Sequence, residues 1–553
     1  MLEAETVHWK AIMRYPVFRQ VCLGLLAVFF LGSGVWAGAQ STPALATVAP
    51  SVERGTTKPG EPRAARAYDA AVRQGPLALH AFLAEFPKGA DLHVHLSGAI
   101  YAETFIRDAA EDGLCVDPSA LKLVKACDQS LVPAARLSGV LTPADQDLYD
   151  RLIDSFSMRS FVPTASFSGH DQFFSTFGRF GGIDKRHTGE WVDEVASRAA
   201  AQNQQYLELM ETPAFSHAAS IAHEIGWPTE AASIDFGRMR QALLDHGLRD
   251  EVVTDRDHVR EIEARRKELE HCGTPQATPA CNVEIRYVYQ VLRGWAPQQV
   301  FAQTLLGFET VQQSIDENDH GFVGLNFVMP EDGFVSMRDY TLHMKMVEYL
   351  HGLYPKVHIS LHAGELVPGL VPPEGLRFHV RQAVELGHAE RVGHGVDIMY
   401  EDHAAELLKE LANKHVMVEI NLSSNDGILE IKAPDHPFPL YRAAHVPVAL
   451  STDDEGVSRI DITHEYVRAA LEYHLGLDDL KQLARTGMEH NFLSGQSLWT
   501  RPDDFTAAAP ACKGQPLGAE KPSAACNKFL EGSEKAAAQW ELERRFREFE
   551  AKF

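Results

Sequence analysis

Two histidines separated by one residue stand in the stretch 87–98, which reads P-K-G-A-D-L-H-V-H-L-S-G. Side chains of a β-strand alternate between two faces, so in a strand His93 and His95 point the same way. Two imidazoles placed like this can clamp a metal ion. Zinc takes about four ligands, however, and an isolated H-x-H is as easily part of an ordinary strand. Partners elsewhere in the chain therefore decide whether this pair is a metal site.

Three further apolar runs end on residues of the kinds that bind metals or move protons. They read H-I-S-L-H-A-G-E (358–365), R-V-G-H-G (391–395) and V-P-V-A-L-S-T-D-D (446–454). Each alone has a plainer explanation, such as a tight turn at G-H-G or a helix cap at the paired aspartates. Four such strand ends in one chain indicate a shared site. The residues at the three further ends are His362, Glu365, His394, Asp453 and Asp454.

Together, the motifs D-L-H-V-H-L, H-A-G-E, G-H-G and S-T-D-D, in this order, resemble the adenosine deaminase family of metal-dependent hydrolases. The resemblance covers roughly residues 81–495 and is greatest to the secreted, growth-factor-related branch. It implies one zinc ion per chain, which would lower the pKa of a bound water to about 7. The ligands it implies are His93, His95, His362 and Asp453.

The implied reaction is attack of metal-activated water on C6 of a purine, with loss of ammonia. Glu365 is expected to protonate N1, which requires a carboxyl group whose pKa is raised by partial burial. His394 is expected to orient or deprotonate the attacking water. Asp454 is expected to accept a hydrogen bond from the substrate or the water.

Three positions depart from the family pattern or stand apart from its motifs. The compact cytosolic members carry an Asp at the place of Ser97, and that Asp contacts the ribose. After the fourth expected strand the usual D-L-x-G-x-E appears as N-F-V-M-P-E, so Met329 stands where Gly is usual. Its backbone N–H can still reach a purine nitrogen, whereas its side chain narrows the pocket. Glu208 is expected either to contact the ribose or to be a locally paired strand carboxylate.

Short apolar runs alternate with longer helical stretches, and from the third run onward they recur every 25 to 40 residues. This rhythm predicts an α/β fold, a (β/α)8 TIM barrel, whose strands would bring the polar residues to one mouth at their C-terminal ends. The expected strands are the run containing His93, then Gln205–Met210, Val283–Val291, Phe322–Val328, Val357–His362, Arg391–Gly395, Val416–Leu422 and Pro447–Ser451.

Additions surround the predicted barrel of residues 63–500. A helical extension is expected over 63–86, a loop-rich insertion covering the mouth after the first strand, and a charged helix over 254–271 within an insertion after the second. Residues 501–553 form a C-terminal extension that ends on a helix over 532–553.

The beginning of the chain has the pattern of an export signal. Basic residues precede an apolar segment at 21–35, and A-G-A at 37–39 offers a cleavage site, so residues 1–39 are predicted to be a signal peptide. Residues 40–62 are rich in Ser, Thr, Pro and Ala and are predicted to be a flexible leader. Met13 competes with Met1 as the true start. The protein is therefore expected to be exported, either to a periplasm or to the outside.

Six cysteines outside the signal fall into three close pairs: Cys115 with Cys127, Cys272 with Cys281, and Cys512 with Cys526. Local disulfides fit an exported protein, with ordinary buried thiols as the alternative. The net charge of −24 argues against binding to nucleic acid or, once the signal is removed, to an anionic membrane. The expected partner is a small purine nucleoside, and the sequence leaves a homodimer open beside a monomer.

The sequence thus predicts a zinc-dependent deaminase that converts adenosine and 2′-deoxyadenosine to their inosine forms. The alternatives are an amidohydrolase acting on another aminopurine or a cyclic amide, and an extracellular binding protein on the same fold. Two-metal amidohydrolases often carry a bridging lysine at the end of the fourth strand, and residues 322–330 contain no Lys. A single metal ion is therefore expected.

Overall fold

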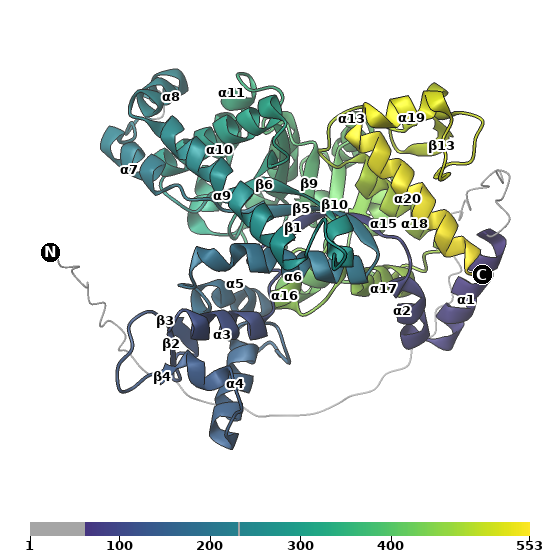
Figure 1. Cartoon of the computed structure of the whole chain (residues 1–553). Helices are drawn as coiled ribbons and strands as arrows, with labels where there is room; N and C mark the ends of the chain where they lie inside the picture. The colour runs from purple at the N-terminus through teal and green to yellow at the C-terminus, as the bar shows by residue number, and fades with distance from the viewer. Residues whose placement is uncertain (1–60, 231–232) are drawn as a thin grey trace, which may run out of the picture. The chain divides into compact units, whose positions relative to one another are not determined.

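The computed structural model of the protein describes residues 61–230 and 233–553 (Figure 1). Within them, eight parallel strands form one sheet in which each pairs with the next along the chain. All eight predicted strands are confirmed. Their bounds are β1 Gly89–His95, β5 Gln204–Glu211, β6 Glu284–Leu292, β7 Phe322–Val328, β8 His358–Ala363, β9 Arg391–His394, β10 Met417–Ile420 and β11 Val448–Leu450.

The sheet closes on itself through the residues just after β11. The backbone N–H of Asp453 donates to the carbonyl of His93 at 2.9 Å, and the N–H of His95 donates to the carbonyl of Asp453 at 3.1 Å. These bonds pair Asp453 with Val94 of β1. The closed parallel sheet with helices around it is the predicted (β/α)8 barrel.

Helices lie between successive strands and cover the barrel, as Figure 1 shows. Because the strands are buried on both faces, apolar residues predominate along them. The covering helices are α6 Thr188–Ala201, α7 Ser216–Ile225, α8 Phe236–Asp245, α9 Leu248–Leu269, α10 Pro297–Glu317, α11 Phe334–His351, α12 His379–Glu385, α13 Ala404–Lys414, α14 Leu422–Leu429, α15 Phe438–Ala443, α16 Glu455–Ser458, α17 Ile462–Glu472 and α18 Leu477–Glu489.

The first insertion, residues 96–187, follows β1 as predicted. A stacked pair of rings, Phe105 and Phe180 with centroids 4.3 Å apart, joins its first helix to the segment after its last. That last helix, α5, begins with a capping box formed by Ser168 and Asp171. The elements of the insertion are α3 Ala102–Glu111, β2 Cys115–Asp117, β3 Lys122–Val124, β4 Val132–Pro133, α4 Pro143–Ser155 and α5 Gly169–Arg179.

The N-terminal extension differs from its prediction. The single helix expected over 63–86 is two helices, α1 Glu61–Gln74 and α2 Pro76–Ala84. Gly75 separates them with φ +103°, a conformation that glycine adopts at little cost, and Pro76 then occupies the first position of the next helix. The charged helix predicted over 254–271 is the later part of α9.

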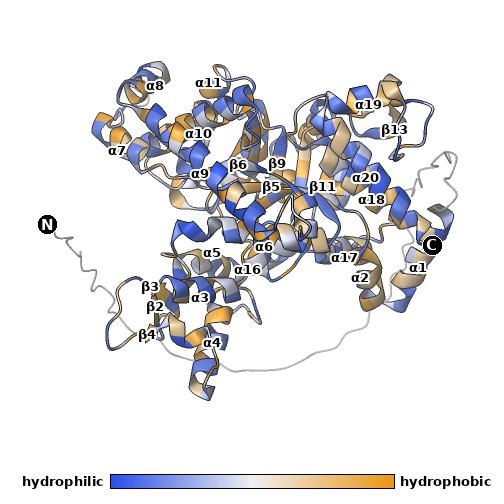
Figure 2. Cartoon of the chain, in the orientation of Figure 1, coloured by the Kyte–Doolittle hydropathy of each residue, from blue (hydrophilic) through white to orange (hydrophobic). Residues whose placement is uncertain are grey.

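The C-terminal extension contains the hairpin β12 Trp499–Arg501 and β13 Asp504–Ala508, followed by α19 Ala524–Glu531 and α20 Glu534–Ala551. The predicted final helix is confirmed as α20. Its Phe549 meets Phe82 of α2 edge to face at 5.2 Å, so the two ends of the described chain pack together. In Figure 2 the visible side of α20 is mostly hydrophilic, as expected of a helix that covers a barrel.

All three predicted disulfides are present: Cys115 with Cys127, Cys272 with Cys281, and Cys512 with Cys526. None of the helices in the described ranges combines the length and the apolar character needed to cross a bilayer. The predicted signal peptide and the leader as far as residue 60 lie outside the described residues.

Candidate metal centre and active site

The predicted site residues stand at the C-terminal ends of the barrel strands. β1 supplies His93 and His95, β8 supplies His362, and β9 ends at His394. His394 and Asp453 have φ values of +69° and +60°, a left-handed conformation that is unfavourable for residues with a Cβ. Such strain at two strand ends of the barrel is typical of functional sites.

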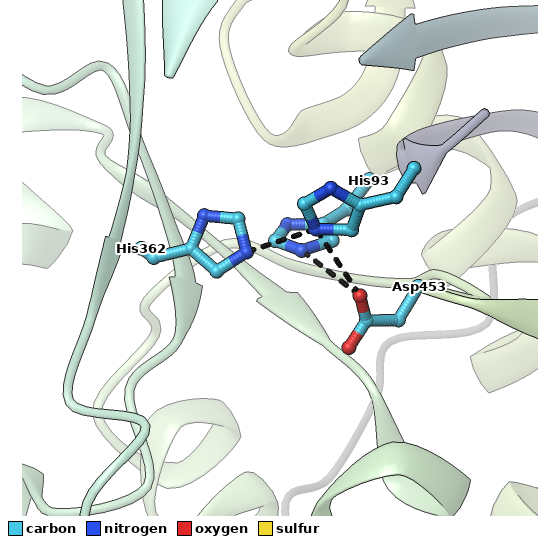
Figure 3. A group of neighbouring side chains, drawn as sticks. His93, His362 and Asp453 are labelled. Carbon is cyan, nitrogen blue, oxygen red and sulfur yellow. Dashed lines mark hydrogen bonds and ion pairs between the residues drawn. The ribbon is translucent and has the colours of Figure 1, made fainter. Parts of the chain in front are cut away.

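Four side chains form the predicted metal-binding cluster, and Figure 3 shows three of them pointing toward one another from separate strands. One potential ligand atom from each lies within 4.8 Å of all the others. Nε2 of His95 and Nε2 of His362 are 3.1 Å apart. Oδ1 of Asp453 is 3.6 Å from Nε2 of His93 and 3.4 Å from Nε2 of His95.

This donor set fits a divalent metal ion. Nε2 of His93 is buried and has no hydrogen-bond partner among the described residues. His95 and His362 turn ring nitrogens toward each other, which is favourable only with a proton or a cation between them. Three imidazoles and one carboxylate are a ligand set that zinc accepts, with room for a further ligand.

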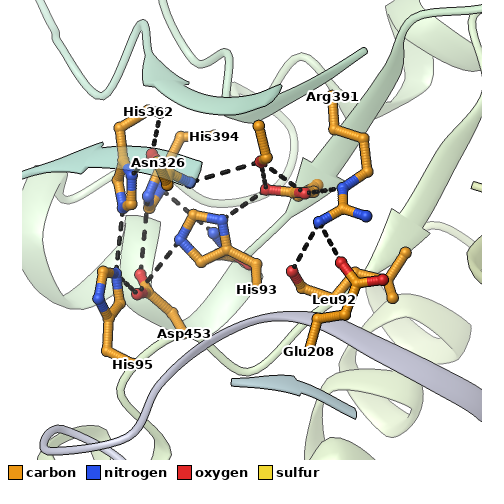
Figure 4. A network of polar contacts seen from close by, with 12 residues as sticks. Leu92, His93, His95, Glu208, Asn326, His362, Arg391, His394 and Asp453 are labelled. Carbon is orange, nitrogen blue, oxygen red and sulfur yellow. Dashed lines mark hydrogen bonds and ion pairs between the residues drawn. The ribbon is translucent and has the colours of Figure 1, made fainter. Parts of the chain in front are cut away.

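Side chains behind the cluster hold its imidazoles in place, as Figure 4 shows. Nδ1 of His93 lies 2.6 Å from Oε2 of Glu419, whose other oxygen accepts from Nε of Arg391 at 2.7 Å. Nδ1 of His362 lies 2.9 Å from Oδ1 of Asn326. Such supporting groups orient metal-binding histidines. The sequence analysis did not identify them.

Glu208 lies behind the cluster and does not line the cavity described below. Its carboxylate is fully buried, with Oε2 2.6 Å from Nη2 of Arg391 and Oε1 2.7 Å from the backbone N of Phe492. Figure 4 shows this pairing with Arg391. The expected ribose contact therefore finds no support here. The geometry is that of the alternative, a locally paired strand carboxylate.

A cavity of about 340 Å³ opens over the cluster and gathers the remaining predicted residues. Its lining includes the predicted metal ligands except His93, which is fully buried. Three phenylalanines of α5 form part of its wall, which confirms that the first insertion covers the mouth. The lining residues are His95, Ser97, Phe173, Phe174, Phe177, Thr212, Gln290, Leu292, Val328, Met329, Pro330, His362, Glu365, His394, Asp453 and Asp454.

Burial sets the protonation of the predicted catalytic groups. It raises the pKa of Glu365 well above its usual value, and the charges of Asp453 and Glu331 act in the same direction. It also raises the pKa of Asp454, again with a contribution from Asp453. For His394 burial disfavours the charged form, so the pKa falls to about 4. A carboxyl group that keeps its proton near neutral pH, as Glu365 does, is what general acid catalysis needs.

Met329 lies at the edge of the cavity with φ +89°, again left-handed for a residue with a Cβ. Its sulfur accepts a hydrogen bond from the N–H of Gly294 at 3.3 Å, so the side chain rests on that glycine. Ser97 lines the same cavity. Both residues predicted to contact the substrate thus lie beside the predicted catalytic groups.

A larger cavity of about 680 Å³ lies elsewhere, along α9 and the first residues of β6 and β7. It contains none of the predicted site residues. Its cations are already paired: Arg256, for example, binds Glu317 and Asp319. The smaller cavity is therefore the candidate active site.

A sequence model of one protein family, named adenosine deaminase, matches residues 190–498. The chain belongs to the adenosine deaminase family. Among curated relatives, the adenosine deaminase of Clostridium perfringens (strain 13 / Type A) is 34% identical over 137 residues, which is 25% of this chain and 38% of that protein. That of Escherichia coli (strain SMS-3-5 / SECEC) is 37% identical over 142 residues, 25% of this chain and 39% of that protein. The chain thus spans about two fifths of the length of the relatives it matches.

Solved structures of two other deaminases are also similar to this chain. Adenine deaminase from Arthrobacter aurescens aligns with a TM-score of 0.47 and 15% identity, over 74% of this chain and 94% of that one. The apo N6-methyl-AMP deaminase of Arabidopsis thaliana aligns with a TM-score of 0.47 and 19% identity, over 75% and 94%. Identities this low say nothing about the substrate of this chain.

Proposed function

We propose that this member of the adenosine deaminase family is an exported, zinc-dependent enzyme that deaminates adenosine and 2′-deoxyadenosine. The observation that carries the proposal is the clustering of His93, His95, His362 and Asp453 beside Glu365, on the floor of one cavity. Water and a purine amine would give the inosine form and ammonia.

The four clustered side chains would hold one zinc ion, which makes water a usable nucleophile at neutral pH by lowering its pKa. Glu365 holds a proton and delivers it to N1 of the purine as the attack on C6 pushes charge onto that nitrogen. His394 orients or deprotonates the attacking water. Asp454 accepts a hydrogen bond from the substrate or the water, and α5 limits the entry of bulk solvent.

A nucleoside suits this cavity better than a nucleotide. Its lining contains Asp, Glu and His but neither Lys nor Arg, and binding of a phosphate normally requires one of them. Two arginines of the first insertion are engaged elsewhere: Arg159 with Asp154, and Arg179 with the carbonyl of Ser155. A cavity of about 340 Å³ is at the small end of ligand sites, as expected for one nucleoside.

Export is supported by the signal-like sequence at 1–39 and by the disulfides, which persist in oxidising compartments. The direct test of the activity uses zinc-loaded protein and a panel of purines, with the loss of absorbance near the adenine band as the signal. Conversion of adenosine and 2′-deoxyadenosine is expected. If zinc binds stoichiometrically and no aminopurine is converted, the proposal is wrong.

A further inference from the structure

Four imidazoles meet at the candidate metal centre. Each turns one ring nitrogen, the inner one, toward the centre and the other, the outer one, toward a supporting group. Some of these groups accept a hydrogen bond from the outer nitrogen, and others donate one to it. A neutral imidazole has one N–H and one bare nitrogen, so the partner of one nitrogen fixes the state of the other. A bare inner nitrogen can bind a metal ion. An inner N–H cannot, and donates a hydrogen bond instead. The outer partners therefore distinguish ligands from donors.

His93 and His362 have acceptors on Nδ1. The partner of His93, Glu419 at 2.6 Å, is a carboxylate that also binds Arg391, so it accepts. The partner of His362 is Oδ1 of Asn326 at 2.9 Å, and the same atom accepts the backbone N–H of His362 at 3.0 Å, which identifies it as the oxygen. Both histidines thus carry a proton on Nδ1 and turn a bare Nε2 inward.

The tautomer of His95 is not fixed by its hydrogen-bond partner. Its Nδ1 faces the side-chain amide of Gln290 at 2.6 Å, and the other end of that amide is bonded to the hydroxyl of Thr212 at 2.6 Å. A hydroxyl both donates and accepts, so the amide can turn either end toward His95.

His394 has the opposite polarity, and a backbone amide sets it. The N–H of Phe438 donates to Nδ1 of His436 at 3.1 Å, so the neutral ring of His436 carries its proton on Nε2. That Nε2 donates to Oδ1 of Asn425 at 2.9 Å. The NH2 group of Asn425 must then point the other way, where it lies 2.9 Å from Nδ1 of His394. The chain of bonds leaves His394 with its proton on Nε2.

Burial stabilises this arrangement of donors and acceptors around His394. The exposed fractions are 2% for His436, 0% for Asn425 and 1% for His394, so bulk water does not compete for these bonds. Burial, with the charge of Arg468 and His394 adding to it, lowers the pKa of His436 to about 3, which keeps its ring neutral. A second amide, Nδ2 of Asn421, lies 3.4 Å from the same nitrogen of His394 and is also a donor there.

We propose that His436 and Asn425 are positioning residues that hold His394 as the Nε2–H tautomer, so that His394 donates a hydrogen bond to the attacking oxygen instead of taking its proton. Nε2 of His394 has no hydrogen-bond partner among the described residues, and lies 3.7 Å from Oδ2 of Asp453 beside the cavity. The identity of the attacking oxygen rests on the proposed deaminase function. The tautomer itself does not.

The substitution Asn425→Asp tests the assignment because it reverses the polarity with little change of shape. A carboxylate accepts from Nδ1, which forces the proton of His394 onto that nitrogen and leaves Nε2 bare and more basic. With His394 as a donor, kcat should fall by at least about 100-fold, because a catalytic histidine held in the wrong tautomer can cost up to about 10⁴-fold. KM and the zinc content should stay within about threefold. An unchanged or increased kcat would show that His394 acts as a base.

Asn491→Asp is the matched control. Asn491 is also buried, at 1% exposure, and also bonds through both ends of its amide, to the carbonyl of Met488 and the N–H of Leu493. It does not line the cavity. Its variant measures the general effect of a buried carboxylate, and its kcat should stay within about twofold of the parent.

Two substitutions at His394 itself keep the test open if Asn425→Asp does not fold. Glutamine offers an N–H donor but no base, and glutamate offers a base but, when ionised, no donor. The donor role predicts that His394→Gln retains at least about tenfold more activity than His394→Glu. The reverse order overturns the proposal.

Tautomers can also be read without catalysis, from ¹⁵N NMR of histidine-labelled protein, with His394→Gln identifying the signal of His394. The expected parent spectrum has the proton of His394 on Nε2, and Asn425→Asp moves it to Nδ1. A parent with the proton on Nδ1 refutes the inference whether or not the protein deaminates anything. If Nε2–H is found and no purine is converted, the deaminase proposal fails while the polarity assignment stands.

Discussion

The backbone N–H of Glu365 donates to Oε2 of Glu331 with an N···O distance of 2.8 Å. The other oxygen of Glu331 accepts from the N–H of Gly364 at 3.0 Å and from Nδ1 of His379 at 2.5 Å. Burial alone would raise the pKa of Glu331, but the hydrogen bond and charge of His379 lower it to about 2. The carboxylate therefore remains a double acceptor that fixes the turn carrying the proposed general acid. His379 is itself held flat against Tyr340, with ring centroids 3.8 Å apart.

Glu331→Gln should lower kcat by about 10²-fold, because an amide can accept only one of the two backbone bonds and a small displacement of Glu365 is costly. KM should change little. Steady-state kinetics measure both. Glu401→Gln is the control. Oε1 of Glu401 also accepts hydrogen bonds from two consecutive backbone amides, those of Val380 and Arg381 in α12, and Glu401 does not line the cavity. Equal losses in both variants would reduce Glu331 to a general structural role.

Glu365→Gln keeps the shape of the side chain and cannot release a proton to N1. The rate should fall by about 10²–10⁴-fold, the usual contribution of a general acid. Zinc content, measured by atomic absorption, should be that of the parent because Glu365 is outside the ligand set. A variant within tenfold of the parent would remove Glu365 from the mechanism.

His95→Ala removes one of the four clustered ligands and should abolish both bound zinc and activity. His358→Ala is the comparison, because His358 stands at the opposite end of β8, where it pairs with Glu390 near the surface. Metal analysis after dialysis should find about one zinc per chain in the parent and in His358→Ala. A full zinc content in His95→Ala would disprove the ligand assignment.

AMP should be a poorer substrate than adenosine by at least about two orders of magnitude in kcat/KM, roughly 2.7 kcal/mol, because no Lys or Arg lines the cavity to hold a phosphate. 2′-Deoxyadenosine, which adds no charge, should be converted at a rate similar to adenosine. The ratio of kcat/KM values from one assay decides this. Comparable values for AMP and adenosine would leave the chemistry intact and overturn the nucleoside preference.

Asp255 should make stability depend on pH. Burial, aided by Glu251, raises its pKa to about 8, whereas in the unfolded chain an aspartate titrates near about 3.9. Between these values the unfolded chain has released a proton that the folded protein keeps, so stability falls as the pH rises from about 4 to about 8. Asp255→Asn cannot lose a proton and should gain at least about 2 kcal/mol on the parent by pH 7, and little at pH 4. Urea unfolding at several pH values measures the difference; a constant difference would refute the prediction.

The strand ends could be predicted from the sequence because residues that can bind metals or transfer protons stand there directly after apolar runs. His362 and Asp453 each follow a largely apolar segment, and a parallel barrel leaves only one place for such residues to meet. The supporting carboxylates carried a weaker signal. Glu208 in Y-L-E-L and Glu419 in M-V-E-I are single charges within apolar strands, a pattern that indicates a buried pair without naming the partner. That partner is Arg391 for both.

The position of the three phenylalanines on α5 could not be predicted, because nothing local fixes where a long insertion docks. The docking depends on contacts distant in sequence. A Cβ at Gly169 would lie 1.9 Å from the carbonyl oxygen of Gly427, so only glycine allows α5 to approach α14 this closely. Nε2 of His170 also lies 2.9 Å from Oδ1 of Asp332, just after β7. The polarity of His394 was equally hidden, since it originates at the backbone N–H of Phe438.

The pairing of Asp453 with Val94 joins the first strand of the barrel to the last, across about 360 residues of chain. The same few residues supply three of the four clustered side chains, so the metal site cannot exist before the two ends of the barrel meet. Contacts this far apart in sequence form late in folding because closing so long a loop costs the most entropy. An ion bound there would stabilise only molecules in which the first and last strands are paired, and it would oppose their separation. Acquisition of the metal would thus mark the last step of folding, in whichever compartment the chain completes it.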